Sequence, residues 1–157
     1  MIWNSHIWKN ELIIEKRKFN KYLKDIRSDK YDTEHFVLGF EKFYFVTAFI
    51  LRKLVENHKV SDELLSQNYK AFKYKRKNID KRLDIFNLIE YWDFYDMNRS
   101  ENTSINIKQL CNLFIHSFIL APIFNEELGM KYSGVFVNTD NTKDSFLYLI
   151  EYELYLK

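Results

Sequence analysis

The chain has 157 residues, of which 46% are hydrophobic, 18% aromatic and 29% charged, and its formal net charge is only +2. A chain of this length is expected to fold as a single domain, residues 1–157, with a sizeable core. One cysteine excludes an internal disulfide and a cysteine-rich zinc site, and three glycines leave no glycine-rich phosphate loop. No basic region precedes an apolar block at the N-terminus, so we predict no secretory signal and a cytoplasmic location.

The charges are unevenly distributed along the chain. Residues 1–82 hold 19 basic and 11 acidic side chains, whereas residues 83–157 hold 5 basic and 11 acidic ones. We expect the two halves to attract each other in the folded protein. The alternative is a basic face that binds an acidic partner.

Residues 5–27 predict a first amphipathic helix, because their apolar side chains recur at steps of three and four. The stretch Phe36–Val55 has the same spacing and is apolar on most sides, which is typical of a buried central helix. A membrane span is the alternative, but Glu41 and Lys42 leave only the nine residues Phe43–Leu51 uncharged, and a span needs roughly 20. We therefore predict no membrane association and expect the other elements to pack around this helix.

The segment Lys70–Arg82 follows a short predicted helix over residues 61–69 and is the most basic part of the chain. It holds seven basic side chains and one acidic one, with aromatic side chains between them. A single-stranded nucleic-acid site combines cations for phosphates with rings for bases. The candidate binding residues are Lys73, Tyr74, Lys75, Arg76 and Lys77. The favoured alternative is an exposed loop or hairpin whose aromatic side chains enter the core.

Residues 85–97 are acidic and aromatic. Glu90, Asp93 and Asp96 are spaced three apart, so on a helix these carboxylates would line one face. Such a face could hold a hard cation such as Mg²⁺. The favoured interpretation is a solvated face, or one that neutralises the basic segment beside it, so we predict no metal site and no cofactor.

A second well-defined helix is predicted for Ser104–Leu120 and is ended by Pro122. One side of it is apolar, and a polar stripe follows at spacings of three and four. The stripe consists of Gln109, Asn112 and His116. These groups must be hydrogen-bonded or solvated, because an unpaired buried amide costs about 1–3 kcal/mol.

The C-terminal part predicts two strands, Tyr132–Thr139 and Ser145–Glu151, joined by the polar turn Asp140–Asp144. A late helix from Asp144 onward is the alternative. The sequence as a whole therefore predicts a mainly α protein: a compact helical bundle around a buried central helix, with a small C-terminal β-hairpin.

Residues 48–54, 110–117 and 134–138 together resemble a family of small bacterial proteins of no assigned function, whose genes are accessory or mobile. This resemblance implies a fold and a genomic setting rather than an activity. A weaker resemblance is to the HEPN helical ribonucleases, which carry an Arg, then four to six intervening residues, then a His. Arg52 and His58 match that spacing, which implies a helical bundle and metal-independent RNA cleavage.

The leading functional hypothesis is a non-catalytic interaction protein of the bacterial cytoplasm, acting in defence, immunity or regulation. It would bind another protein or a second copy of itself, because catalytic motifs are missing while Tyr and Trp, which are enriched at interfaces, are abundant. A third hypothesis is nucleic-acid binding through residues 70–82.

The alternative to the interaction protein is a metal-independent ribonuclease. His116 or His58 would act as general acid or base, Arg52 would stabilise the developing charge, and Asn112 would orient the histidine. This hypothesis requires Arg52 to face Asn112 and His116 across two packed helices. The opposing interpretation pairs Arg52 with Glu56 and makes His116 a hydrogen-bonded core residue.

Overall fold

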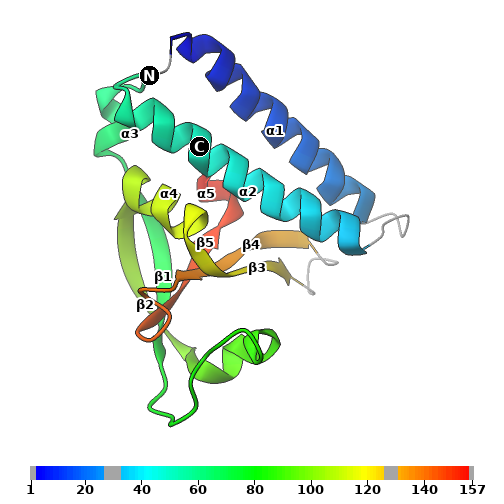
Figure 1. The fold of residues 1–157 in the computed structure, drawn as a ribbon, viewed down its shortest axis with the longest axis vertical. Helices are drawn as coiled ribbons and strands as arrows, with labels where there is room; N and C mark the ends of the chain where they lie inside the picture. The colour runs from blue at the N-terminus through cyan, green and yellow to red at the C-terminus, as the bar shows by residue number, and fades with distance from the viewer. Residues whose placement is uncertain (1–2, 27–32, 126–130, 156–157) are drawn as a thin grey trace.

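The computed structural model of the protein describes residues 3–26, 33–125 and 131–155. Two long helices open the chain, and five strands with shorter helices follow (Figure 1). The helices are α1 (Ser5–Ile26), α2 (Thr33–Glu56), α3 (Asp62–Ser66), α4 (Ile107–Ile115), α5 (Tyr152–Tyr155) and the 3-10 helix η1 (Leu88–Phe94). The strands are β1 (Asn68–Arg76), β2 (Tyr95–Asn106), β3 (Ser117–Asn125), β4 (Lys131–Thr139) and β5 (Phe146–Glu151).

The five strands form one antiparallel sheet in the order β2-β1-β5-β4-β3. The predicted mainly α fold is therefore wrong, since the protein is α+β and the sheet is far larger than a C-terminal hairpin. The two predicted strands do form, as β4 and β5, but they occupy inner positions of the sheet. Part of the basic segment Lys70–Arg82 forms most of β1, which lies next to β5 in the sheet. The mostly polar residues Tyr95–Asn106 form β2 at the edge of the sheet.

The predicted helix Ser104–Leu120 is also wrong at both ends. Its first residues complete β2, the helix α4 ends at Ile115, and the chain then continues as β3. Pro122 lies inside β3, where a residue without a backbone N–H is tolerated because β3 is an edge strand. The proline therefore marks a strand at the sheet edge and not the stop of a helix.

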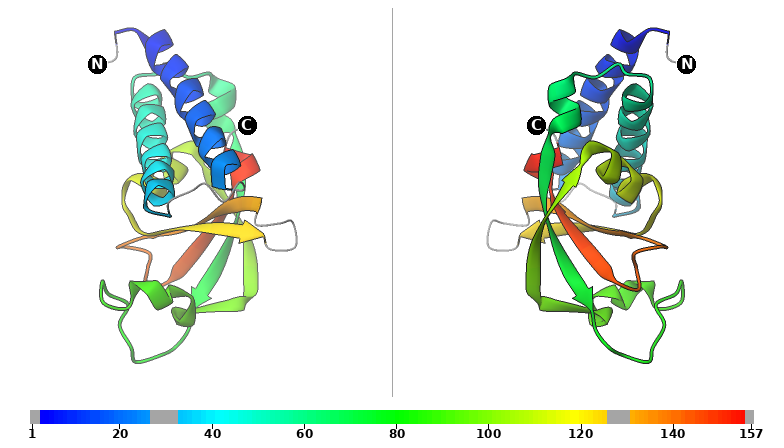
Figure 2. Two further views of the ribbon diagram at one scale, coloured as in Figure 1. Left: turned by 90° about the vertical axis from the view of Figure 1, so that its right-hand side faces the viewer. Right: turned by 90° about the vertical axis from the view of Figure 1, so that its left-hand side faces the viewer.

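The sheet has a different cover on each face, which is visible when Figure 1 and Figure 2 are compared. The long helices and α4 pack over one face, with Tyr44 and Phe114 fully buried there. On the other face the segment 77–94 folds back over the strands. Its anchors Leu83 and Phe94 are fully buried against Leu147 of β5.

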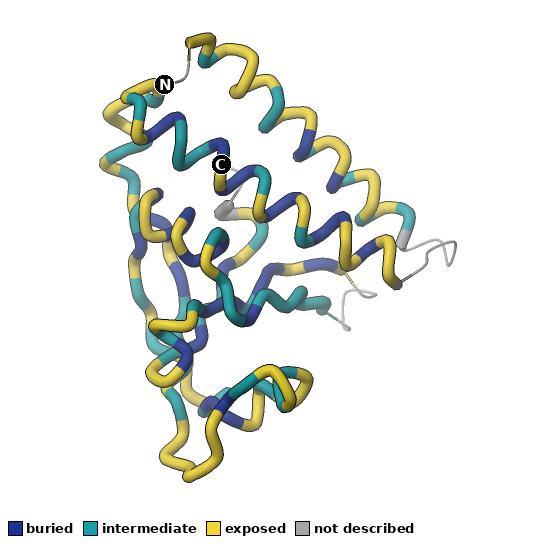
Figure 3. Tube along the Cα trace, in the orientation of Figure 1, coloured by how far each residue is buried: buried dark blue, intermediate teal, exposed yellow. Residues whose placement is uncertain are grey.

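Helix α2 lies against both α1 and α4 and buries one side only. Phe40, Phe43 and Tyr44 on that side are at most 1% exposed, whereas Leu38 and Phe45 on the outer side are exposed. Figure 3 shows this as alternation of buried and exposed residues along the helix. The expectation that every other element packs around α2 is therefore wrong, because α2 is covered on one side only. Within the described residues, no helix combines the length and the apolar character that crossing a bilayer requires.

A buried polar network ties the start of β2 to β3, β4 and the β4–β5 turn. The Tyr95 hydroxyl donates to the Lys143 carbonyl at 2.6 Å and accepts a hydrogen bond from Asn138 Nδ2 at 2.8 Å. Asn138 Oδ1 in turn accepts from the Ile119 backbone N–H at 3.1 Å. Since both side chains are 0% exposed, these bonds satisfy groups that water cannot reach.

Candidate functional site

A polar cleft of about 430 Å³ opens between α2, α4 and the β4–β5 turn. Three of the four residues predicted to act together line it: Arg52, Asn112 and His116. Its other lining residues are Ile105, Gln109, Leu113, Thr139, Asn141, Thr142 and Tyr148. We call the cleft lined by these ten residues the polar cleft.

Helix α4 positions one wall of the polar cleft. Asn106 and Gln109 form a reciprocal capping box, in which each side-chain oxygen accepts the other residue's backbone N–H, at 3.0 and 2.9 Å. Leu110, Cys111 and Phe114 face the core, so the stripe of Gln109, Asn112 and His116 faces outward. Burial raises the pKa of the Cys111 thiol to about 12, which makes it a core group and no nucleophile.

Arg52 joins α2 to α4 across the polar cleft. One terminal nitrogen of its guanidinium donates to Asn112 Oδ1, and Nε donates to Glu56 Oε1 at 2.8 Å. Lys53 Nζ also lies 2.9 Å from Glu56 Oε2, and these hydrogen bonds from Arg52 and Lys53 lower the pKa of the Glu56 carboxyl. The geometry required by the ribonuclease hypothesis is therefore present, and so is the Arg52–Glu56 pair that the opposing interpretation expected.

The two candidate histidines lie in different places. His116 follows the last turn of α4, where its backbone N–H donates to the Asn112 carbonyl at 3.1 Å. Its side chain is exposed, and no described residue hydrogen-bonds the ring, so it is not a core histidine. His58 follows the end of α2 with a positive φ of 53° and does not line the polar cleft.

The polar cleft thus contains one imidazole among its lining residues. Acid–base cleavage of RNA requires one group to take a proton and another to give one. Ribonuclease activity stays a prediction.

The β4–β5 turn supplies a wall that the sequence did not reveal. The Thr139 backbone N–H donates to Thr142 Oγ1 at 2.9 Å, and the two threonine hydroxyls lie 3.1 Å apart. Tyr148 of β5 lies beside this turn in the polar cleft. A polar turn was predicted here, but its position opposite α4 follows from the strand order, which no local pattern specifies.

The basic candidates lie on β1, where acidic side chains hold several of them. Lys73 and Lys75 both approach Glu101 of β2, at 3.5 and 2.6 Å. Arg76 lies 3.8 Å from Asp144 and donates to the Lys81 carbonyl. These ion pairs join the basic half of the chain to the acidic half, as the uneven charge distribution predicted.

The other basic candidates are placed differently. Tyr74 is half-buried with its ring 5.8 Å from that of Phe136, and Lys77 is exposed at the end of the strand. Nucleic-acid binding through residues 70–82 stays a prediction. It now requires the ligand to compete with Glu101 for Lys73 and Lys75.

The acidic segment does not form the predicted helical face. Glu90 and Asp93 belong to η1, whereas Asp96 lies on β2. Glu90 approaches Lys81 at 3.6 Å. Among the residues that the structure describes, no group of three His, Cys, Asp or Glu side chains is arranged to hold a metal ion.

Large apolar side chains are exposed on several elements of the described chain, and two groups of them are considered as surfaces. The first, which we call the outer ridge, comprises Leu38, Phe45 and Phe49 of α2, with exposed fractions of 64%, 39% and 49%. Beside it lies an apolar groove of about 340 Å³, which Trp8 of α1 and Ile115 of α4 help to line.

The second surface is the apolar tip, Ile85, Phe86, Ile89 and Trp92, at the opposite end of the molecule (Figure 2). Aromatic residues typical of interfaces do not share one patch here: the examples are Trp3, Trp8, Trp92 and Tyr95. Trp3 and Trp8 belong to the α1 end, Trp92 belongs to the apolar tip, and Tyr95 is buried.

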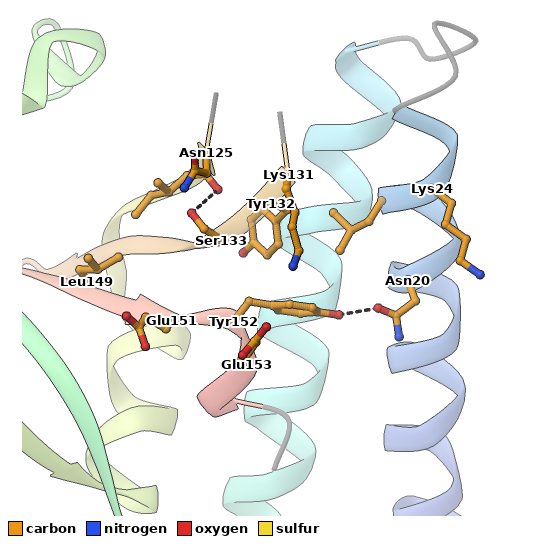
Figure 4. Close-up of a pocket in the computed structure, with 12 residues that line it drawn as sticks. Asn20, Lys24, Asn125, Lys131, Tyr132, Ser133, Leu149, Glu151, Tyr152 and Glu153 are labelled. Carbon is orange, nitrogen blue, oxygen red and sulfur yellow. Dashed lines mark hydrogen bonds between the residues drawn. The ribbon is translucent and has the colours of Figure 1, made fainter. Parts of the chain in front are cut away.

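A further pocket of about 660 Å³ lies between α1 and the ends of β4 and β5. Figure 4 shows Tyr152 reaching across it to α1, where its hydroxyl donates to Asn20 Oδ1 at 2.8 Å. Lys24, Lys131 and Glu151 contribute charges of both signs. No residue predicted for a site lies in this pocket, and its central contact links α1 to α5.

Comparison of the chain with protein-family models, curated proteins and solved structures gives no match. Both resemblances described above stay predictions. The large sheet departs from the helical bundle that the HEPN resemblance implies.

Proposed function

We propose that the protein is a non-catalytic interaction protein and that the outer ridge binds a second copy of the chain. The observation that supports this is the exposure of Leu38, Phe45 and Phe49 along the side of α2 that faces away from the sheet. Contiguous exposed apolar side chains are typical of interaction surfaces. A homodimer places the same ridge on both sides of the interface.

The size of the apolar surface agrees with a stable dimer. Trp8, Leu38, Phe45 and Phe49 are 40%, 64%, 39% and 49% exposed. At about 200 Å² for each whole side chain, they present roughly 400 Å² of apolar surface. A standard interface buries about 800 Å² per partner, of which about 56–65% is apolar. The ridge and the groove beside it therefore supply most of the apolar core that such a dimer needs.

Charged side chains around the outer ridge favour an antiparallel arrangement of two α2 helices. Glu41 lies in the first half of α2, whereas Lys53 lies near its end. Antiparallel pairing brings the glutamate of each copy towards the lysine of the other. Opposite charges at the rim of an interface favour one register over others.

The test is the mass of the protein in solution, measured by light scattering during size-exclusion chromatography over a range of concentrations. We expect twice the 19.3 kDa of one chain for the native protein, and a single-chain mass for the variant Phe45→Glu/Phe49→Glu. The matched control is Ile85→Glu/Phe86→Glu, which adds the same charges at the apolar tip and should remain dimeric. Circular dichroism confirms that each variant is folded.

Two results would overturn the proposal. One is a native protein of single-chain mass at every concentration. The other is a dimer that persists in the outer-ridge variant while the apolar-tip variant dissociates.

A further inference from the structure

We propose that the polar cleft binds a nucleoside monophosphate group, either as a free nucleotide or as one nucleotide of single-stranded RNA. This inference does not depend on the outer ridge, because the residues that carry it are Arg52, Asn112, His116 and Tyr148. A dimer that forms through the outer ridge does not use the polar cleft, so the cleft remains open to such a ligand.

Arg52, the cation of the polar cleft, is positioned to bind an anion. The Arg52 guanidinium is held by Asn112 on one terminal nitrogen and by Glu56 on Nε. No described residue hydrogen-bonds its second terminal nitrogen. His116 lies one turn beyond Asn112 with an exposed ring. Guanidinium and imidazole groups are strong partners for phosphate oxygens.

None of the described residues that line the polar cleft carries a carboxylate, so a bound anion meets no direct repulsion from them. The nearest acidic group that the structure pairs with the site is Glu56, which already neutralises part of the Arg52 charge. Removing that carboxylate should therefore strengthen anion binding. This expectation distinguishes a binding site from a purely structural ion pair.

The remainder of the polar cleft fits the nucleoside part of the ligand. Tyr148 offers a partly exposed ring, and the largely buried Ile105 and Leu113 form an apolar floor of the polar cleft. Asn141 and Thr142 add amide and hydroxyl groups at the edge, where they can hydrogen-bond a base or a ribose. The volume of about 430 Å³ lies within the range of small-ligand pockets. An inorganic phosphate alone would leave the ring and the apolar surface without a partner.

The experiment is isothermal titration calorimetry at low salt with the four ribonucleoside monophosphates, inorganic phosphate and a short single-stranded RNA. We expect Arg52→Gln to weaken nucleotide binding by about tenfold or more and Glu56→Gln to strengthen it several-fold. Lys18→Gln is the matched control, because it removes a carboxylate-paired cation of α1 that lies outside the polar cleft and outside the basic segment, and it should leave the affinity unchanged. Thermal unfolding confirms that each variant is folded.

The same titrations distinguish a free nucleotide from one nucleotide of an RNA strand. Free monophosphates that bind as tightly as RNA identify a free nucleotide, whereas binding of RNA alone identifies a strand. The proposal is overturned if neither binds, if inorganic phosphate binds as tightly as the nucleotides, or if Arg52→Gln binds as well as the native protein. Because the mass measurement concerns the outer ridge, failure of either proposal is seen independently of the other.

Discussion

Replacing Tyr95 by Phe removes one hydroxyl from the buried polar network and leaves the aromatic ring in place. That hydroxyl donates to the Lys143 carbonyl at 2.6 Å and accepts from Asn138 Nδ2 at 2.8 Å. Tyr95 and Asn138 are both 0% exposed, so water cannot replace the lost hydrogen bonds without rearrangement. Leaving a buried polar group without a partner costs about 1–3 kcal/mol. We therefore expect Tyr95→Phe to lower the free energy of unfolding by about 2 kcal/mol.

The assay is equilibrium unfolding in urea, followed by circular dichroism. With an m-value of about 2 kcal/mol/M, the expected loss moves the unfolding midpoint down by about 1 M. The control is Tyr74→Phe, which makes the same chemical change in the same core, where the Tyr74 hydroxyl bonds no described residue. We expect less than about 0.5 kcal/mol there. Equal losses in the two variants would refute the reasoning, because they would show that the hydrogen bonds of Tyr95 contribute nothing beyond its ring.

Three further predictions follow from the same structure. Burial raises the pKa of Tyr95 to about 12, so the folded state favours the neutral phenol. The free energy of unfolding should therefore fall as the pH rises from about 10 towards 12. Urea unfolding across this pH range should show a shallower fall for Tyr95→Phe than for the native protein. Gly134→Ala should unfold the protein or cost more than about 3 kcal/mol, because the added Cβ overlaps the Ile150 carbonyl oxygen. The control Gly39→Ala meets only the Tyr22 ring edge at 2.9 Å and gains helix propensity, so thermal unfolding should show a much smaller change. Labelled RNA should stay intact with the native protein, and cleavage that disappears in His116→Ala but persists in His58→Ala would instead establish a nuclease in the polar cleft.

The β-sheet was underpredicted because its two least obvious strands carry few apolar side chains. In β1 the buried positions are Tyr69 and Ala71, Lys70 lies between them, and three more basic residues follow before the strand ends, so the segment looks like a basic loop. In β2 nine of the twelve residues are polar, and only Tyr95 and Ile105 are buried. Alternation of apolar and polar residues identifies a strand only where one face is buried along its whole length.

The stripe of α4 was predictable, whereas the rest of the polar cleft was not. Spacings of three and four place Asn112 and His116 on one side of any helix, and Arg52 lies on a helix predicted to pack beside it. Thr139 and Tyr148 reach the same cleft only because β1 inserts between β2 and β5 and orders the strands around it. Such pairing joins residues distant in the sequence, and no local pattern encodes it.

The apolar sequence of α2 predicted a buried central helix, but the structure leaves one side of this helix exposed. Its sequence is apolar on more sides than the chain itself can cover. Periodicity predicts which residues share a side of a helix, but it does not specify what lies against that side. In the structure α1, α4 and the sheet cover the sides that include Phe40, Phe43 and Tyr44, and the side with Phe45 and Phe49 is left exposed. The surplus of apolar residues over what one copy buries is therefore the physical reason to expect a second copy on the outer ridge.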